Sequence, residues 1–414
     1  MSPQKNHKWT FRARFRRHAF GWRSQPPIKR IREAVSEIKK AARKDPVLGA
    51  EGAVLLLEKL SPAIEQVDSS SGAIGSAVNK AVETLVPIIA KAPADETVQD
   101  KWLDRLWQAV EDDHIPYIEM LTEFWGELCV TPECASRWAD TFISTVRAMW
   151  QLPRGEQGFF KGTTACLSAL YTAGRNEEIL ELLELSPYKF WSYHQWGVRA
   201  LVAMGKTAEA LRYAEDCRSP YESTFLIAET CEQILLESGM VEEAYRRFAI
   251  EANEKTTCLA TFRAVAKKYP GKEAAEILRD LVESTPGREG KWFAAAKSAG
   301  LYREAIELAN RTPCDIRTLS RAARDIAQTR PEFAVEAGMI ALRWLVEGYG
   351  YEITSVVVRD AYQYTMNAAE YAGSRPGTFE RIRKLIAGEV YGERFVTQVL
   401  ARELGLDGPS EEDG

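Results

Sequence analysis

Histidine is scarce in this sequence, and its cysteines do not form an obvious set of pairs. Only four of the 414 residues are histidines (His7, His18, His114 and His194), so a histidine-based general base has few candidates. The seven cysteines are odd in number and scattered, which argues against a disulfide framework and favours free thiols in apolar helix faces. Cys129 and Cys134 alone lie close in sequence, and no second Cys/His pair is near enough to complete a zinc site. The sequence therefore predicts no metal and no cofactor.

The signatures of common enzyme classes are also missing. We find no Gly-x-Ser-x-Gly nucleophile elbow, no His-Glu-x-x-His motif and no dinucleotide-binding glycine fingerprint. Carboxylate pairs are abundant, as expected on solvated helices, but their convergence on one point is not visible in a sequence. We predict that the protein is not an enzyme.

Two polar segments are compatible with ligand binding, and each has a simpler explanation. Residues 111–114 (Glu-Asp-Asp-His) offer metal-ligand types, but adjacent helical residues point in different directions, which favours a helix end with a solvated acidic face. Residues 68–76 are rich in Ser and Gly and precede a helix, where free amides can hold a phosphate. No strand precedes this loop and no Gly-Lys-Ser/Thr ending follows, so a serine N-cap is favoured.

Long apolar runs are absent as well. No uninterrupted apolar stretch reaches the roughly 18 residues that a membrane span needs. The N-terminus lacks the apolar region of a secretory signal. We therefore expect a cytoplasmic protein with no membrane span.

Charge is distributed unevenly along the chain. The sequence has 54 basic and 59 acidic side chains, for a net charge of −5. Residues 1–30 hold nine Lys or Arg and no acid, which leaves −14 on the remaining residues. The sequence thus predicts a basic arm on an acidic body.

The basic arm, residues 1–27, interleaves arginines with aromatic rings. Its candidate contact residues are Arg12, Arg14, Arg16, Arg17 and Trp22. The arm could dock on its own body or on a protein partner, with the rings in apolar grooves and the arginines on carboxylates. It could instead bind nucleic acid, through phosphate contacts and base stacking, or an anionic membrane surface. We favour docking, and the position of the arm in the structure is the observation that separates these interpretations.

Apolar residues at helical spacing predict helices between the arm and residue 151. We expect one from Ile28 after a Pro26-Pro27 stop, one over Leu48–Leu60 and one over Ala77–Ile89. Pro93 to Asp95 indicate a linker, and three amphipathic helices follow between 97 and 151. At helical spacing, the tryptophans of this stretch are expected in the core.

The stretch Phe159–Cys314 contains internal repeats. Helical runs end at Gly174, Gly205, Gly239, Gly271 and Gly300, at intervals of 31, 34, 32 and 29 residues. Four of these glycines are followed at the fourth and fifth positions by Glu-Ile or Glu-Ala, and most second helices stop before a Ser-Pro or Thr-Pro pair. This period is typical of stacked helix pairs, each too small to bury its apolar face alone.

Glycine, three residues, Glu-Ala and a closing proline resemble the turn and second helix of a tetratricopeptide repeat, over about 150 residues. The resemblance implies an all-α fold, an α-α superhelix of repeats. The glycine-to-proline distances of 13 to 15 residues are shorter than in that family, and the first helices lack its aromatic-glycine pattern.

From Phe15 to Leu404 the chain also resembles a bacterial all-helical family known as a domain of unknown function. The segments that carry this resemblance are Ala19 to Trp22, Lys40 to Pro46, Asp68 to Gly72 and Lys291 to Lys297. The part from Gly271 onward is similar to helical regions of some proteins annotated with a SWIM-type zinc finger. The chain has no Cys-x-Cys…Cys-x-His set, so the resemblance implies a fold and neither zinc nor DNA binding.

An aromatic segment, Tyr188 to Trp196, holds five rings in nine residues. A helix turns about 100° per residue, so these rings cannot all face one core. Trp191, Tyr193 and Trp196 are candidate partner contacts, although packing between neighbouring repeats is favoured.

We expect a basic arm (1–27), an N-terminal helical segment (28–95), a Trp-rich segment (96–158), repeats (159–313), C-terminal helices (314–405) and an acidic tail (406–414). The C-terminal helices are predicted over Ile316–Thr329, Phe333–Gly348, Ser355–Ala372, Phe379–Ala387 and Phe395–Leu404. The leading functional hypothesis is a scaffold or adaptor that binds an unidentified protein partner on the inner face of the repeats. The alternative is a nucleic-acid-binding protein that uses the arm.

Overall fold

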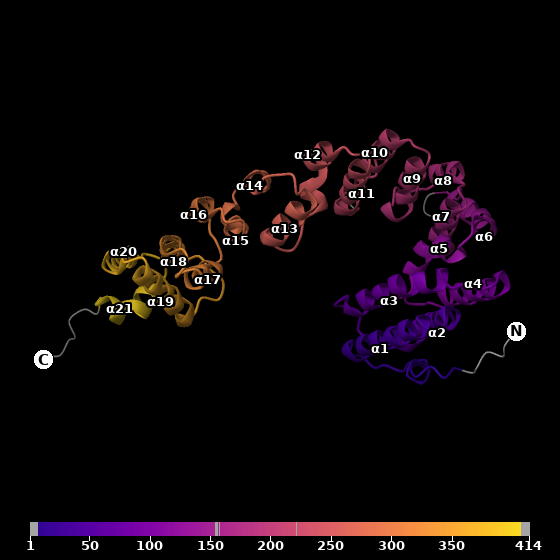
Figure 1. The fold of residues 1–414 in the computed structure, drawn as a ribbon, viewed down its shortest axis with the longest axis horizontal. Helices are drawn as coiled ribbons and strands as arrows, with labels where there is room; N and C mark the ends of the chain where they lie inside the picture. Colours follow the sequence, from indigo (N-terminus) through magenta and orange to yellow (C-terminus); the bar gives the residue numbers. More distant parts are fainter. Residues whose placement is uncertain (1–6, 154–155, 157, 221, 407–414) are drawn as a thin grey trace. The chain divides into compact units, whose positions relative to one another are not determined.

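The computed structural model describes residues 7–153, 156, 158–220 and 222–406. Over these residues the regular secondary structure is helical, with no strand, which confirms the predicted all-α class (Figure 1). The chain divides into two compact units, residues 1–230 and 231–414, and the division falls inside α11 (Thr224–Glu237). Leu406 begins the predicted acidic tail, and the rest of that tail lies outside the described residues.

Unit 1 is built on a continuous apolar core that extends along the sequence from Trp9 to Ala200. Trp102 and Trp125 are fully buried in it, as predicted for the Trp-rich segment. Its helices are η1 (Phe11–Ala13), α1 (Gln25–Ala42), α2 (Pro46–Ile64), α3 (Ala73–Ala90), α4 (Glu96–Glu111), η2 (Glu119–Phe124), α5 (Trp125–Cys129), α6 (Pro132–Trp150), α7 (Gly162–Thr172), α8 (Asn176–Glu184), α9 (Trp191–Ala203) and α10 (Thr207–Glu215).

The first three helices begin earlier or run further than predicted. Pro26 and Pro27 lie in the first turn of α1, where a missing N–H leaves no hydrogen bond unmade, so the helix includes them and begins at Gln25, before the predicted Ile28. Pro62 lies inside the last turn of α2, and the helix continues past it to Ile64. The N-cap of α3 is Gly72, in the left-handed region at φ 69° and without a side-chain cap, so the predicted serine N-cap is wrong.

Helix α3 has the length and composition of a membrane span, with a mean hydropathy of 1.3 over its 18 residues. No other described helix passes that test. Its apolar residues Ile74, Val78 and Val82 are fully buried, and α3 packs on α1 and α2. A core helix passes the same test of length and hydropathy, so α3 is weak evidence for a span.

Unit 2 contains the predicted C-terminal helices. Their observed bounds lie within a few residues of prediction, and α21 matches it at both ends. The helices after α11 are α12 (Val241–Ala252), α13 (Cys258–Lys268), α14 (Ala274–Glu283), η3 (Glu289–Trp292), α15 (Phe293–Ser298), α16 (Tyr302–Arg311), α17 (Ile316–Asp325), α18 (Pro331–Val346), α19 (Ser355–Tyr371), α20 (Arg375–Ala387) and α21 (Phe395–Leu404).

Four of the five predicted glycine corners share one backbone conformation. Gly174, Gly205, Gly239 and Gly300 have φ between 73° and 77°. Each donates its N–H to a carbonyl three residues earlier, and the next residue donates to the carbonyl five residues before it, as in a Schellman motif. Gly271 has no positive φ, because the chain leaves α13 through Tyr269 and Pro270. Gly348 and Gly373 make the same corner outside the predicted repeats.

Candidate binding groove

The arm lies on unit 1, where residues 7–24 pack against α1 and α2. Trp9, Phe11 and Phe15 are buried in the core, so these rings are not free to stack on bases. Gly52 of α2 has no side chain because a Cβ there would enter the Trp9 indole. Backbone hydrogen bonds from the His18 N–H to the Pro62 carbonyl (2.9 Å) and from the Phe20 N–H to the Ala63 carbonyl (3.4 Å) fix the rest of the arm along the end of α2.

The arginines of the arm are only partly used in this packing. Arg14 pairs with Glu33 at 3.0 Å. Arg12, Arg16 and Arg17 are exposed and form no ion pair with a carboxylate of the described residues. Trp22 is 72% exposed. The docking interpretation therefore holds for the buried rings of the arm, whereas Trp22 and these three arginines are exposed to solvent.

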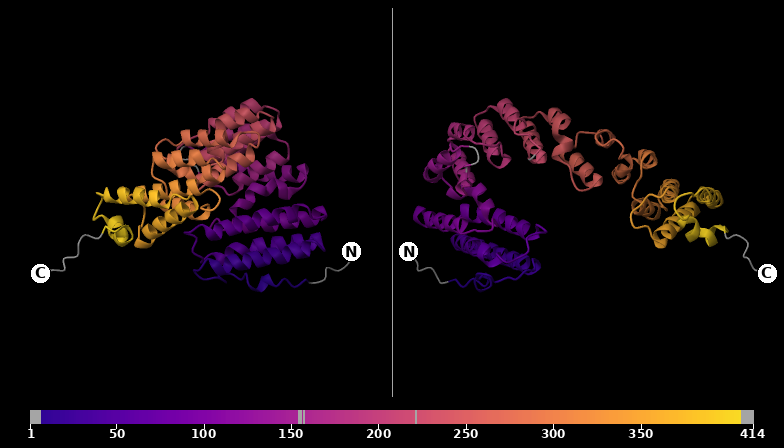
Figure 2. Two further views of the ribbon diagram at one scale, coloured as in Figure 1. Left: turned by 60° about the vertical axis from the view of Figure 1, so that its left-hand side comes forward. Right: turned by 180° about the vertical axis from the view of Figure 1, so that it is seen from behind.

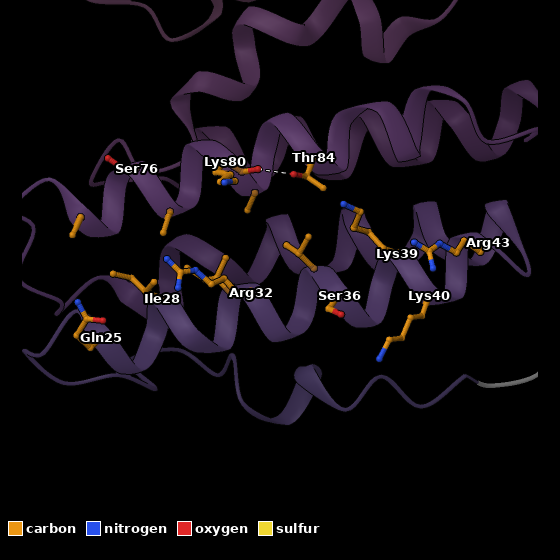
Figure 3. Close-up of a pocket in the computed structure, with 15 residues that line it drawn as sticks. Gln25, Ile28, Arg32, Ser36, Lys39, Lys40, Arg43, Ser76, Lys80 and Thr84 are labelled. Carbon is orange, nitrogen blue, oxygen red and sulfur yellow. Dashed lines mark hydrogen bonds between the residues drawn. The ribbon is translucent and has the colours of Figure 1, made fainter. Parts of the chain in front are cut away.

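A groove of about 750 Å³ lies between α1 and α3 (Figure 3). The two helices run in the same direction along it, with Gln25 and Ser76 toward one end and Arg43 toward the other. Figures 1 and 2 place α1, α2 and α3 side by side in unit 1, and each pair of them is in contact. The lining residues are Gln25, Ile28, Ile31, Arg32, Val35, Ser36, Lys39, Lys40, Arg43, Ala73, Ser76, Ala77, Lys80, Ala81 and Thr84.

The periodicity of α1 creates one wall of this groove. Ile28, Ile31 and Ile38 are buried at helical spacing against α2 and α3. That packing turns the residues between them outward, so Arg32, Ser36, Lys39, Lys40 and Arg43 are exposed. The stripe from Arg32 to Arg43 is about 16 Å long, at 1.5 Å per residue.

The α3 wall of the groove is made mainly of small side chains. Ala73, Ala77 and Ala81 recur every four residues and therefore lie on one helix face. Ser76 and Thr84 extend that face, and the Thr84 hydroxyl is satisfied by the Lys80 carbonyl at 2.8 Å. Lys80 is exposed and adds a cation to this side. The groove thus has a shallow, small-residue wall on α3 and a cationic wall on α1.

The electrostatics of the groove are one-sided. Its lining contains five cations (Arg32, Lys39, Lys40, Arg43 and Lys80) and no carboxylate. None of the five forms an ion pair with a carboxylate of the described residues. A negative charge of a ligand about 4 Å from one of these cations is stabilised by on the order of 1 kcal/mol in water without salt screening. The stabilisation is larger where the groove excludes water.

A second groove, between the arm and α1, differs in charge balance. Its cations include Arg14 and Arg30, which bind Glu33 at 3.0 and 2.6 Å. The hydrogen bond from Arg30 holds the pKa of Glu33 below its usual range. Glu37 accepts the Thr10 N–H at 2.8 Å. Arg14 and Arg30 of this second groove are thus neutralised within the chain, whereas Arg32 and Lys40, which line both grooves, form no ion pair with a carboxylate of the described residues.

The aromatic candidates of the repeats are largely occupied by packing. Trp191 and Trp196 are 5% and 3% exposed, and the Tyr193 ring lies 5.7 Å from that of Trp150. The exposed rings of the segment are Tyr188 and Phe190. Contacts with the neighbouring helices decide which rings of this segment are covered, and the sequence alone does not show those contacts.

A cavity of about 630 Å³ lies beside His194 and Tyr213. His194 Nδ1 is 2.6 Å from the Tyr213 hydroxyl, and burial lowers the pKa of His194 to about 4. The imidazole is therefore neutral near pH 7. Glu184, Glu209 and Asp216 line the cavity together with Lys189 and Arg212, so its charges are mixed and favour no ligand of one sign.

The acidic helix end at residues 111–114 is not fully solvated, which corrects the sequence interpretation. Asp113 is 3% exposed and accepts hydrogen bonds from the Ser61 hydroxyl and from the Ile118 N–H at 2.8 Å. Lys161 donates to the carbonyls of Val110 and Asp113 at 2.8 and 2.6 Å. These contacts tie the end of α4 to α2 and α7. Across the described residues no three His, Cys, Asp or Glu side chains are grouped as metal ligands.

The fold and its main groove together define an all-helical protein with an exposed, unneutralised cationic groove. No protein-family model matches the chain, and no curated protein matches it in sequence. The resemblances described above therefore stay predictions. The groove was missed in the sequence, although one signal was present: residues 29–44 contain seven Lys or Arg against two Glu.

Proposed function

We propose that this protein is a cytoplasmic, non-catalytic scaffold that binds a protein partner with an acidic surface, and that the α1–α3 groove is its main contact. The observation that carries the proposal is the set of five cations without a carboxylate around one groove. Mutually repelling charges lower stability, so a surface that keeps them close together is best explained by a ligand of opposite sign. The helical repeats, which we propose form a superhelical solenoid, lie outside this groove and would offer further contact area for the partner.

A salt-dependent binding measurement tests the proposal directly. Fluorescein-labelled poly-L-glutamate is titrated with the full chain at low and at high salt, and we expect binding that weakens as salt rises. The test variant is Lys39→Glu/Arg43→Glu/Lys80→Glu. The variant loses three exposed ion pairs with the ligand, each of about 0.5 kcal/mol, so it should bind at least about tenfold more weakly than the wild-type chain.

The matched control is Lys267→Glu/Arg383→Glu/Lys384→Glu, which makes the same charge change at exposed positions of unit 2. Because this variant changes the net charge and leaves the groove intact, its affinity for poly-L-glutamate should stay within about twofold of that of the wild-type chain. Absence of binding at low salt, or an equal loss in both triple variants, would overturn the proposal.

The alternative, nucleic-acid binding through the arm, is supported by the exposed Arg12, Arg16 and Arg17. It predicts that a single-stranded DNA probe binds with a steep salt dependence, and that Arg12→Ala/Arg16→Ala/Arg17→Ala reduces this binding most. The burial of Trp9, Phe11 and Phe15 removes the base-stacking part of that hypothesis. We therefore prefer the protein partner.

A further inference from the structure

We propose that the occupant of the α1–α3 groove is an amphipathic helix of the partner, with an apolar face toward α3 and acidic residues on its flanks. This inference rests on the proposed function and specifies the form of the acidic ligand. Its basis is the combined shape and charge of the groove, with small residues on one wall and five cations around them (Figure 3).

The length and direction of the groove match a helix. Its lining extends along α1 from Gln25 to Arg43, the full length of an 18-residue helix of about 27 Å. On α3 the lining covers Ala73 to Thr84, three turns of the helix that runs beside it. Two helices packed side by side leave a linear depression, into which the side chains of a third helix can interlock.

The packing of α1, α2 and α3 leaves one position of a helical bundle unfilled. Each of these helices contacts the other two, and the groove lies along the side of the α1–α3 pair that none of the described helices fills. A further helix on the groove side would produce the four-helix arrangement that commonly buries such faces. The half-buried Val35, Ala73 and Ala77 are the apolar groups that it would cover.

The small residues of α3 determine how close a partner helix can come. Alanine and serine at positions 73, 76, 77 and 81 present little side chain, so a helix carrying leucines could reach the floor of the groove. Phosphates of a nucleic acid or of lipid headgroups would use the cations but gain nothing from this apolar floor. The alanine face therefore favours a peptide helix over these polyanions.

The spacing of the cations fits acidic residues on a helix. Arg32, Ser36, Lys39, Lys40 and Arg43 follow one stripe of α1, and Lys80 lies on the opposite wall. Carboxylates three or four residues apart on a bound helix would repeat along the same axis with the same rise. The ligand is thus defined as a helix with an apolar stripe bordered by Glu or Asp on both sides.

Two synthetic peptides of 18 residues, the length of α1, provide the test. One places leucines at i, i+3, i+4 and i+7 with glutamates on both flanks, and the other is a scrambled isomer with the same composition and charge. Fluorescence anisotropy with the full chain should show the amphipathic peptide binding at least about tenfold tighter, because only it can bury a leucine stripe. Circular dichroism should show helix formation on binding.

A matched pair of variants locates the contact. Ser76→Phe adds a ring inside the groove, whereas Asn79→Phe adds the same ring at an exposed position of α3 outside it. Ser76→Phe should remove the tenfold preference and leave poly-L-glutamate binding nearly unchanged, and Asn79→Phe should retain both. Ala77→Phe is a second groove variant, and an unchanged far-UV spectrum confirms that each variant folds.

Equal binding of the two peptides would overturn the amphipathic-helix inference while leaving the acidic-partner proposal intact. Tighter binding of a single-stranded DNA or of vesicles with anionic lipid, lost in Ser76→Phe, would overturn it in favour of those ligands. Concentration-dependent dimerisation that Ser76→Phe abolishes would identify a second copy of this chain as the occupant and would also overturn it. Failure of poly-L-glutamate to bind would instead remove the proposed function.

Discussion

The buried carboxylate of Glu232 provides a test of how burial strengthens a hydrogen bond in unit 2. Glu232 is fully buried on α11 and accepts from Asn253 Nδ2 at 2.7 Å, Lys268 Nζ at 2.5 Å and the Tyr269 hydroxyl at 2.6 Å. These donors lie at the ends of α12 and α13, so one side chain holds three helices together. Burial, followed by the hydrogen bond to Glu232, raises the pKa of Tyr269.

The perturbation is Tyr269→Phe, and a neighbouring tyrosine supplies the comparison. The Tyr245 hydroxyl also donates to a carboxylate at 2.6 Å, that of Asp280, and the two tyrosine rings are 5.1 Å apart. The two bonds have the same length and chemistry, but Tyr245 and Asp280 are half-buried. We expect Tyr269→Phe to lower the free energy of unfolding by about 1.5–3 kcal/mol, because a buried charge loses a donor. Tyr245→Phe should lower it by less than about 1 kcal/mol, since water can replace the hydroxyl.

Hydrogen exchange read by mass spectrometry is the suitable assay, because a chain of two compact units need not unfold in one step. Peptides covering α11 to α14 report the opening free energy of this region, and peptides from α18 and α19 serve as an internal reference. Equal losses for the two tyrosine variants would refute the reasoning, because the bond lengths are equal and the predicted difference depends on burial.

Two further predictions concern the backbone corners and the buried acid. Gly205→Ala should lower the free energy of unfolding by about 1–2 kcal/mol in urea denaturation, because the φ of Gly205 is 76° and no other atom crowds the site. The control Gly75→Ala, inside α3, should be neutral or stabilising. Similar values for both variants would contradict the left-handed conformation assigned to Gly205. Burial raises the pKa of Asp113, so the folded state binds its proton more tightly than the unfolded state. The stability of the wild-type chain relative to Asp113→Asn should therefore rise as the pH falls from that raised pKa toward the ordinary pKa of aspartate. Urea denaturation across this pH range measures the difference, and Asp112→Asn is the surface control. A stability difference between the wild-type chain and Asp113→Asn that does not change with pH would contradict this prediction.

Local chemistry determined the parts of this structure that could be predicted from sequence. A glycine at the end of a helix fixes a left-handed corner through hydrogen bonds within six residues, so Gly174, Gly205 and Gly300 could be placed directly. The C-terminal helices followed from apolar periodicity for the same reason. The predicted helix bounds were wrong next to Pro26, Pro27 and Pro62, where the missing N–H has no consequence or is tolerated within the helix.

Tertiary structure decided the rest, because it depends on which helices meet. The buried rings of the arm require the space at Gly52, and the burial of Asp113 requires Ser61 from another helix. The cationic groove likewise joins α1 to α3, whose lining residues are about 40 positions apart in sequence. The charges and small residues are visible in the sequence, but their neighbours are not, since packing between distant segments determines which side chains share a surface and which are neutralised.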